Sequence, residues 1–194
     1  ASLNNLNRFD VFIKRAYVRS YLRGQVDPFI EDLYIKHILI INGDGHEEYV
    51  TNAYATESSI NIEEVDQKLV NRNLFKEKNL IVLNGVNDIS TGLSSDIISF
   101  SEMGGSIFII PGKDALENNT NLLLSNLGLP PFSSKRTVNL NANKIASKDP
   151  FFKSIFEPSD ESLNLPNYKS IYTCDVLNTT AIPLMFLRDK SPVF

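Results

Sequence analysis

The chain has 194 residues, of which 42% are hydrophobic and 22% are charged, and this composition is typical of a globular protein rather than a disordered or fibrous one. Its net charge of −4 provides no positive field that would attract a phosphate backbone, so nucleic acid is not an expected partner. The single cysteine, Cys174, excludes an internal disulfide and a paired-cysteine metal site. No apolar run in the sequence is long enough to span a bilayer.

Residues 1–36 are expected to form an N-terminal extension that packs on the domain. Within this extension, Asp10 to Tyr17 alternates loosely between apolar and polar residues and fits either an edge strand or a short helix. The dipeptide Asp27-Pro28 marks a break, because the residue before a proline avoids the helical region. Basic residues cluster here and are interpreted as a solvated face: Lys14, Arg15, Arg19 and Arg23.

Three continuous apolar runs predict strands that are buried on both faces. The runs cover residues 37–41, 80–84 and 106–110. Helical patterns separate them, so we expect parallel neighbours joined by right-handed crossovers. A further strand is expected from Ile60 to Val65, followed by a short helical or irregular crossover from Asp66 to Phe75.

The expected crossover helices follow from apolar spacing and from end signals. A helix from His46 to Thr56 is expected after the first run. Ser90 is expected to cap a helix that runs to Met103, with Leu93, Ile97 and Phe100 facing inward. Gly104-Gly105 should end that helix. A capping box of Asp114 and Glu117 predicts a last helix, whose apolar face would carry Leu122, Leu123, Leu124 and Leu127.

The pattern changes after Phe132, where shorter strands are expected at residues 137–140, 170–174 and 180–187. A helical turn that buries aromatic residues is expected at 150–156. We therefore expect an α/β domain with a single core over residues 37–194, in which residues 131–194 are an elaboration. Because the chain starts at Ala1 and a return strand opens at 192–194, we also expect a fragment of a longer protein.

Three stretches of the chain resemble a known family: Asn79 to Gly112, "KDPFFKSIFE" from Lys148, and "LNLPNYKSIY" from Leu163. They are similar to the class I glutamine amidotransferase-like domain of membrane-anchored, BatA-like aerotolerance-operon proteins of Bacteroidetes. The resemblance implies a flavodoxin-like parallel sheet with helices on both faces. It also implies a parent protein with transmembrane helices and a von Willebrand-type domain, and a location on the periplasmic side of the membrane.

The resemblance also indicates which chemistry the chain lacks. Amidotransferases of this class carry a cysteine nucleophile on the tight turn after the strand that matches residues 106–110. Here that turn reads Ile110-Pro111-Gly112-Lys113-Asp114 and offers no cysteine, serine or threonine. We therefore expect a degenerate active site with no catalytic residue, and a protein that is not an enzyme.

Polar residues follow the carboxyl ends of the three buried runs, where open parallel sheets bind ligands. The candidate ligand-binding residues are Asp44, His46, Asn84, Asp88 and Lys113. The competing interpretation is that they are turn residues. Asp44, His46 and the following glutamates could hold a metal ion, or they could form the acidic first turn of a helix. No second histidine motif supplies the remaining ligands of a metal site. No metal and no cofactor are expected.

The sequence thus favours a non-catalytic interaction or scaffold domain whose partners are proteins or other domains of the parent chain. The alternative is a hydrolase or small-ligand-binding domain that uses Asp44 and His46. Convergence of His46, Asp88 and Lys113 in one pocket would favour the alternative. Cys174 lies in an expected strand and should be a buried, unreactive thiol.

Overall fold

The computed structural model describes residues 36–55, 57–115, 119–146, 149, 165–176 and 181–192. The expectations for residues 1–35, for Glu117 and for the helical turn at 150–156 lie outside these ranges. The chain divides into two compact units, of which the first ends at Leu123 and the second begins at Leu124. Among the described residues, no helix has both the length and the hydropathy needed to cross a membrane.

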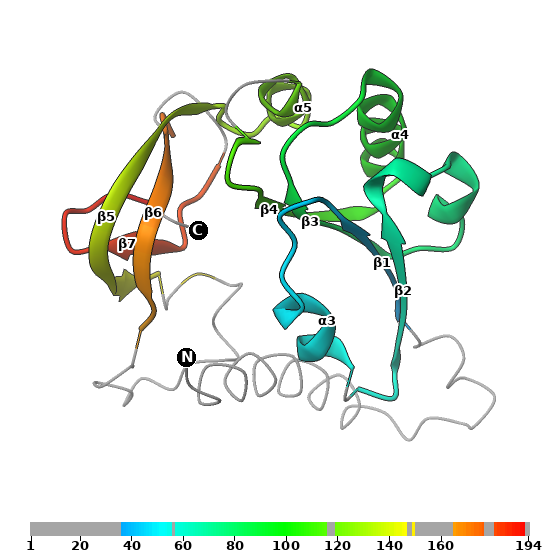
Figure 1. The fold of residues 1–194 in the computed structure, drawn as a ribbon, viewed down its shortest axis with the longest axis horizontal. Helices are drawn as coiled ribbons and strands as arrows, with labels where there is room; N and C mark the ends of the chain where they lie inside the picture. The colour runs from blue at the N-terminus through cyan, green and yellow to red at the C-terminus, as the bar shows by residue number, and fades with distance from the viewer. Residues whose placement is uncertain are drawn as a thin grey trace. The chain divides into compact units, whose positions relative to one another are not determined.

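The first unit contains a four-stranded parallel sheet with the order β2-β1-β3-β4 (Figure 1). Its strands are β1 (Lys36–Asn42), β2 (Ile60–Asp66), β3 (Leu80–Val86) and β4 (Ser106–Pro111). This arrangement confirms that the three apolar runs are parallel neighbours, with β3 between β1 and β4. It also confirms the strand expected after the first run.

Burial on both faces explains why β1 and β3 are apolar throughout. Leu39 and Ile81 point to one face, Ile40 and Val82 point to the other, and all four are fully buried. Burying an aliphatic side chain of this size contributes about 1.5–3 kcal/mol. A polar residue in either strand would therefore face a packed core on whichever side it pointed.

One face of the sheet is covered by α4 (Thr91–Glu102) and by the 3-10 helix η3 (Arg72–Phe75). Ser90 caps α4 as predicted, because its hydroxyl accepts a hydrogen bond from the Leu93 amide at 3.2 Å. The expected stripe of Leu93, Ile97 and Phe100 is buried. The Phe100 ring meets Phe75 edge to face, with ring centroids 6.0 Å apart.

The opposite face carries α3 (Tyr49–Tyr54), as Figure 1 shows. Val50 and Tyr54 of α3 pack against a cluster of Ile38, Ile40 and Val82. The helix is shorter than the predicted range of 46–56, because His46 is held in the preceding turn and no side chain caps the first turn at Glu48. Helices therefore lie on both faces of the sheet.

The last helix, α5 (Thr120–Asn126), buries Leu123 and Leu124. The prediction that Leu122 belongs to its apolar face is wrong, since that side chain is 56% exposed. The helix ends before Gly128, which takes a φ of 73° that suits glycine.

The second unit contains a separate antiparallel sheet with the order β6-β5-β7. Its strands are β5 (Phe132–Ile145), β6 (Asn167–Cys174) and β7 (Met185–Leu187). The prediction of a short strand at 137–140 is wrong, because β5 has 14 residues. Conversely, β7 is shorter than the predicted 180–187, since Pro183 cannot donate a ladder hydrogen bond just before it. The core of this sheet consists of Ala142, Ile171 and Leu187.

Candidate functional site

Four glycines bring the ends of three parallel strands into direct backbone contact. Gly43 and Gly45 follow β1, Gly85 lies near the end of β3, and Gly112 follows β4. A Cβ atom on Gly43 would lie 2.5 Å from the Gly85 carbonyl oxygen, and one on Gly85 would lie 2.4 Å from the Gly45 backbone. A Cβ atom on Gly112 would lie 2.7 Å from the same Gly85 oxygen. We call these four residues the glycine junction.

Backbone hydrogen bonds hold the junction together. The Gly43 amide donates to the Asn84 carbonyl at 2.9 Å, and the Gly112 amide donates to the Val86 carbonyl at 3.0 Å. In an open parallel sheet, ligands bind beyond the carboxyl ends at the point where the strand order reverses. In the order β2-β1-β3-β4 that point lies between β1 and β3, where Gly43 contacts Gly85. Backbone therefore packs closely against backbone at the point where the strand order reverses.

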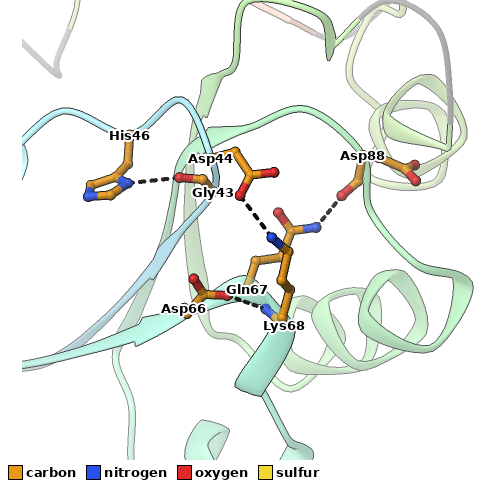
Figure 2. Close-up of polar contacts among 7 residues, drawn as sticks. All are labelled: Gly43, Asp44, His46, Asp66, Gln67, Lys68 and Asp88. Carbon is orange, nitrogen blue, oxygen red and sulfur yellow. Dashed lines mark hydrogen bonds and ion pairs between the residues drawn. The ribbon is translucent and has the colours of Figure 1, made fainter.

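His46 is fixed on its own turn. Its Nδ1 atom lies 2.8 Å from the Gly43 carbonyl oxygen, so the tautomer with a proton on Nδ1 donates this hydrogen bond. Figure 2 shows the His46 ring and the Asp44 carboxylate directed to different sides of the turn. These two residues therefore do not form the hydrogen-bonded acid–base pair that the hydrolase alternative requires.

Asp44 instead pairs with Lys68 of the 3-10 helix η2 (Gln67–Leu69), with 3.0 Å between Oδ1 and Nζ. The hydrogen bond from Lys68 to Asp44, followed by the charge of Asp44, raises the pKa of Lys68. Both side chains are 74% exposed, so water screens the pair and its contribution to stability is small.

Asp88 is bonded by Gln67, the residue before Lys68 in η2. The Gln67 side-chain amide donates to the Asp88 backbone carbonyl, as Figure 2 shows. Consecutive residues of η2 thus tie the turn after β1 to the loop after β3. Sequence reasoning missed Gln67 and Lys68, although they follow the carboxyl end of β2 and the rule that gathered the other rim residues would have found them.

Asn84 lies beneath this rim and is 2% exposed. Its amide donates to Asn42 Oδ1 at 2.9 Å and to the Glu47 carbonyl at 3.0 Å. Asn42 in turn donates to Glu64 Oε2 at 2.9 Å, and Thr51 of α3 donates to the same oxygen at 2.9 Å. These bonds link β2, β1, β3 and α3, so Asn84 has a structural role in this arrangement.

Lys113 lies exposed on the turn after β4. That turn is held by Asn87, whose Oδ1 atom accepts a hydrogen bond from the Asp114 amide at 2.9 Å. The structure thus joins Asp44 and Asp88 to consecutive residues of η2, directs His46 to the other side of the Gly43 turn, and buries Asn84. Among the described residues, no three His, Cys, Asp or Glu side chains group closely enough to hold a metal ion.

Cys174 ends β6 and is partly exposed, so the prediction of a buried thiol is wrong. It sits at the end of its strand, opposite Phe132 at the start of β5, and the edge of the sheet leaves it half-covered. Burial, followed by the charge of Asp175, raises the pKa of the thiol. A raised pKa lowers the thiolate fraction at neutral pH, which is the reverse of what a nucleophile needs.

No protein-family model matches the chain, and comparison with curated proteins finds no significant match.

Proposed function

We propose that this chain is a non-catalytic interaction or scaffold domain. The observation that carries the proposal is the glycine junction, in which the backbone of three strand ends packs tightly together at the point beside which an open parallel sheet binds its ligand. A Cβ atom on Gly43, Gly85 or Gly112 would lie only 2.4 to 2.7 Å from neighbouring backbone, so the strand ends pack tightly against one another at this point. The polar residues around the junction then have a structural role, because their hydrogen bonds hold neighbouring turns together.

The bonding of the rim residues supports the same conclusion. Nucleophilic catalysis needs a nucleophile, a base within hydrogen-bond reach and a group that orients the base. The His46 ring bonds the Gly43 carbonyl rather than Asp44, and the Asp44 carboxylate is engaged by Lys68, so the two do not act as an oriented pair. The end of β4 and the turn after it carry Pro111, Gly112 and Lys113 where an amidotransferase of this class carries its cysteine nucleophile.

The strand order also fits a degenerate member of the amidotransferase-like family. The order β2-β1-β3-β4 is the same as that of the first four strands of a flavodoxin-like sheet. Together with the resemblance of residues 79–112, this order favours a BatA-like, membrane-anchored parent protein. The partners would then be other proteins or other domains of that parent, on the periplasmic side of its membrane.

Turnover assays test the proposal against the hydrolase alternative. The purified chain would be assayed with glutamine, ester and phosphoester substrates in the presence of divalent metals. We expect the rate of the wild-type chain to equal the rates of Asp44→Ala and His46→Ala variants. Glu102→Ala, an exposed acidic residue at the end of α4, is the matched control.

Turnover that disappears in both Asp44→Ala and His46→Ala, but persists in Glu102→Ala, would overturn the proposal. Circular dichroism of each variant would establish that the loss does not come from unfolding.

A further inference from the structure

Both Asn-Gly pairs of the chain lie at the glycine junction. Asn42-Gly43 lies where β1 ends, and Asn84-Gly85 lies near the end of β3. Because glycine has no side chain to shield its backbone nitrogen, asparagine loses its side-chain amide most readily when a glycine follows it. The folded structure then decides whether either pair reacts.

The reaction joins the glycine nitrogen to the side chain of the preceding asparagine. The nitrogen attacks the asparagine Cγ atom and loses its proton, a C–N bond forms, and the side-chain nitrogen leaves as ammonia. The product is a cyclic succinimide. Water then adds to either carbonyl carbon of the ring and opens it, which gives aspartate or isoaspartate. The glycine nitrogen must therefore be free to approach the Cγ atom.

In the folded chain, both reacting groups of Asn42-Gly43 are held in hydrogen bonds. The Gly43 N–H donates to the Asn84 carbonyl at 2.9 Å. The Asn42 side chain accepts a bond from Asn84 Nδ2 and donates to Glu64 Oε2, both at 2.9 Å. Ring closure has to break these bonds, so Asn42 reacts at a rate that scales with the fraction of molecules in which the end of β1 has opened.

Asn84 is protected more strongly than Asn42. Its side chain is 2% exposed and also donates to the Glu47 carbonyl at 3.0 Å. Asn42 is the last residue of β1 and is half-buried. The end of a strand opens at a lower free energy than a buried position within one, so Asn42-Gly43 should react first.

The product does not fit the bonds that Asn42 makes. A carboxylate at position 42 has no N–H to donate and would face the Glu64 carboxylate across a hydrogen-bond distance. Isoaspartate also inserts an additional backbone atom before Gly43, which moves the Gly43 amide away from the Asn84 carbonyl. Because the ammonia has left, the chain cannot restore the original side chain.

We propose that Asn42-Gly43 is a deamidation site that the glycine junction protects, and that reaction there irreversibly loosens the carboxyl edge of the parallel sheet. The proposal is independent of whether the domain is catalytic.

Site-resolved mass spectrometry of the full 194-residue chain, incubated at mildly alkaline pH, tests the protection. We expect Asn42 to deamidate at least about tenfold more slowly in the folded chain than in the urea-unfolded chain, because reaction requires local opening. Glu64→Ala removes the acceptor of the Asn42 amide and should speed the reaction of Asn42 severalfold while Asn84 stays unchanged. Glu64→Gln keeps an acceptor oxygen, so this matched control should react at close to the wild-type rate.

Urea denaturation tests the consequence of the reaction. Asn42→Asp, which carries one of the two products, should lower the urea midpoint. Asn73→Asp, which makes the same change at an exposed position of η3, is the control and should leave the midpoint nearly unchanged.

Three results would overturn the proposal. Equal rates at Asn42 in the folded and unfolded chains would show that the junction gives no protection. Equal acceleration of Asn42 and Asn84 in Glu64→Ala would show that the reaction proceeds through global unfolding rather than through the end of β1. An unchanged urea midpoint in Asn42→Asp would show that the product does not loosen the edge.

Discussion

Glycines at the carboxyl edge of the parallel sheet are required for two different reasons. Gly85 has a φ of 68°, a conformation that other residues adopt at a cost of about 1–2 kcal/mol, and its position also leaves no space for a Cβ atom. Gly43 has an ordinary φ, and only the approach of Gly85 excludes a side chain there. Both positions therefore depend on how closely the turn after β1 lies against β3.

Gly85→Ala should lower the free energy of unfolding by more than about 2 kcal/mol, because backbone strain adds to the steric clash with Gly45. Gly92→Ala is the matched control: Gly92 lies in α4 and a Cβ there meets nothing within 4 Å. Since alanine is the better helix former, the control should be neutral or stabilising by up to about 1 kcal/mol. Urea denaturation measures both, and equal midpoints for the two variants would contradict the close contact at the junction.

The Cys174 thiol should react slowly in the native protein at neutral pH. Burial and the charge of Asp175 raise its pKa, so the reactive thiolate is less abundant than in an ordinary thiol. We expect the rate at which a thiol reagent labels Cys174 to increase with pH over a higher pH range than for a free cysteine. At neutral pH, the Asp175→Asn variant should react modestly faster than the wild type. Labelling of the native protein as fast as that of the urea-unfolded chain would show that the thiol is not covered and that its pKa is not raised.

At the scale of the elements, α4 is the helix whose boundaries the sequence indicates most directly. Ser90→Ala should lower the free energy of unfolding by about 1 kcal/mol, because the Leu93 amide loses its hydrogen-bond acceptor. Ser95→Ala, at an exposed position inside α4, should be neutral or slightly stabilising. Equal effects of the two changes on the urea midpoint would rule out the cap.

In the second unit, the turn after β7 is held by Asp189. Its carboxylate accepts a hydrogen bond from the Ser191 amide at 3.0 Å and pairs with Arg136 Nη2 of β5 at 2.5 Å. Hydrogen bonds from Ser191, followed by the bond and charge of Arg136, lower the pKa of Asp189 below its ordinary value of 3.8. The carboxylate thus stabilises this turn above that value, and the stabilisation is lost as the pH falls through the lowered pKa.

Carboxyl NMR titration should place the pKa of Asp189 below that of an unfolded aspartate. Arg136→Gln should move the pKa part of the way back, since the Ser191 amide remains in place. An Asp189 pKa that is ordinary in the wild type, or unchanged in the variant, would contradict these contacts.

The strands differ in how well their sequences indicate them. β1 and β3 could be predicted because strands buried on both faces must be apolar along their whole length. The run at 106–110 also predicts a strand, but the expected burial on both faces is wrong, since Ile107 to Ile110 of the edge strand β4 are only half-buried. The full length of β5 could not be predicted, since its first half from Ser133 to Thr137 is exposed and has no alternation to detect, and the sequence predicts only the part at 137–140. The glycine junction also could not be predicted, because it depends on the register of β1 against β3, which no local pattern encodes.

At the scale of the whole molecule, the chain combines two sheets of different kinds. The first unit has a parallel sheet with helices on both faces, and the second has an antiparallel sheet whose core is much smaller. The candidate residues Asp44, His46, Asn84, Asp88 and Lys113 all belong to the first unit. Their hydrogen bonds run to neighbouring turns and strands. In the function we propose, the carboxyl edge of the parallel sheet therefore has the structural role of joining its strands.

Amide chemical shifts at the glycine junction test most directly whether this edge binds a small ligand. A ¹H–¹⁵N spectrum would follow the amides of Gly43, Gly45, Gly85 and Gly112 during titration with magnesium, glutamine and a phosphoester analogue, with Gly92 in α4 as the internal reference. We expect no saturable shift at the four junction glycines relative to Gly92. A saturable shift at these glycines that disappears in Asp44→Ala would contradict a closed edge and would identify the rim as a binding site.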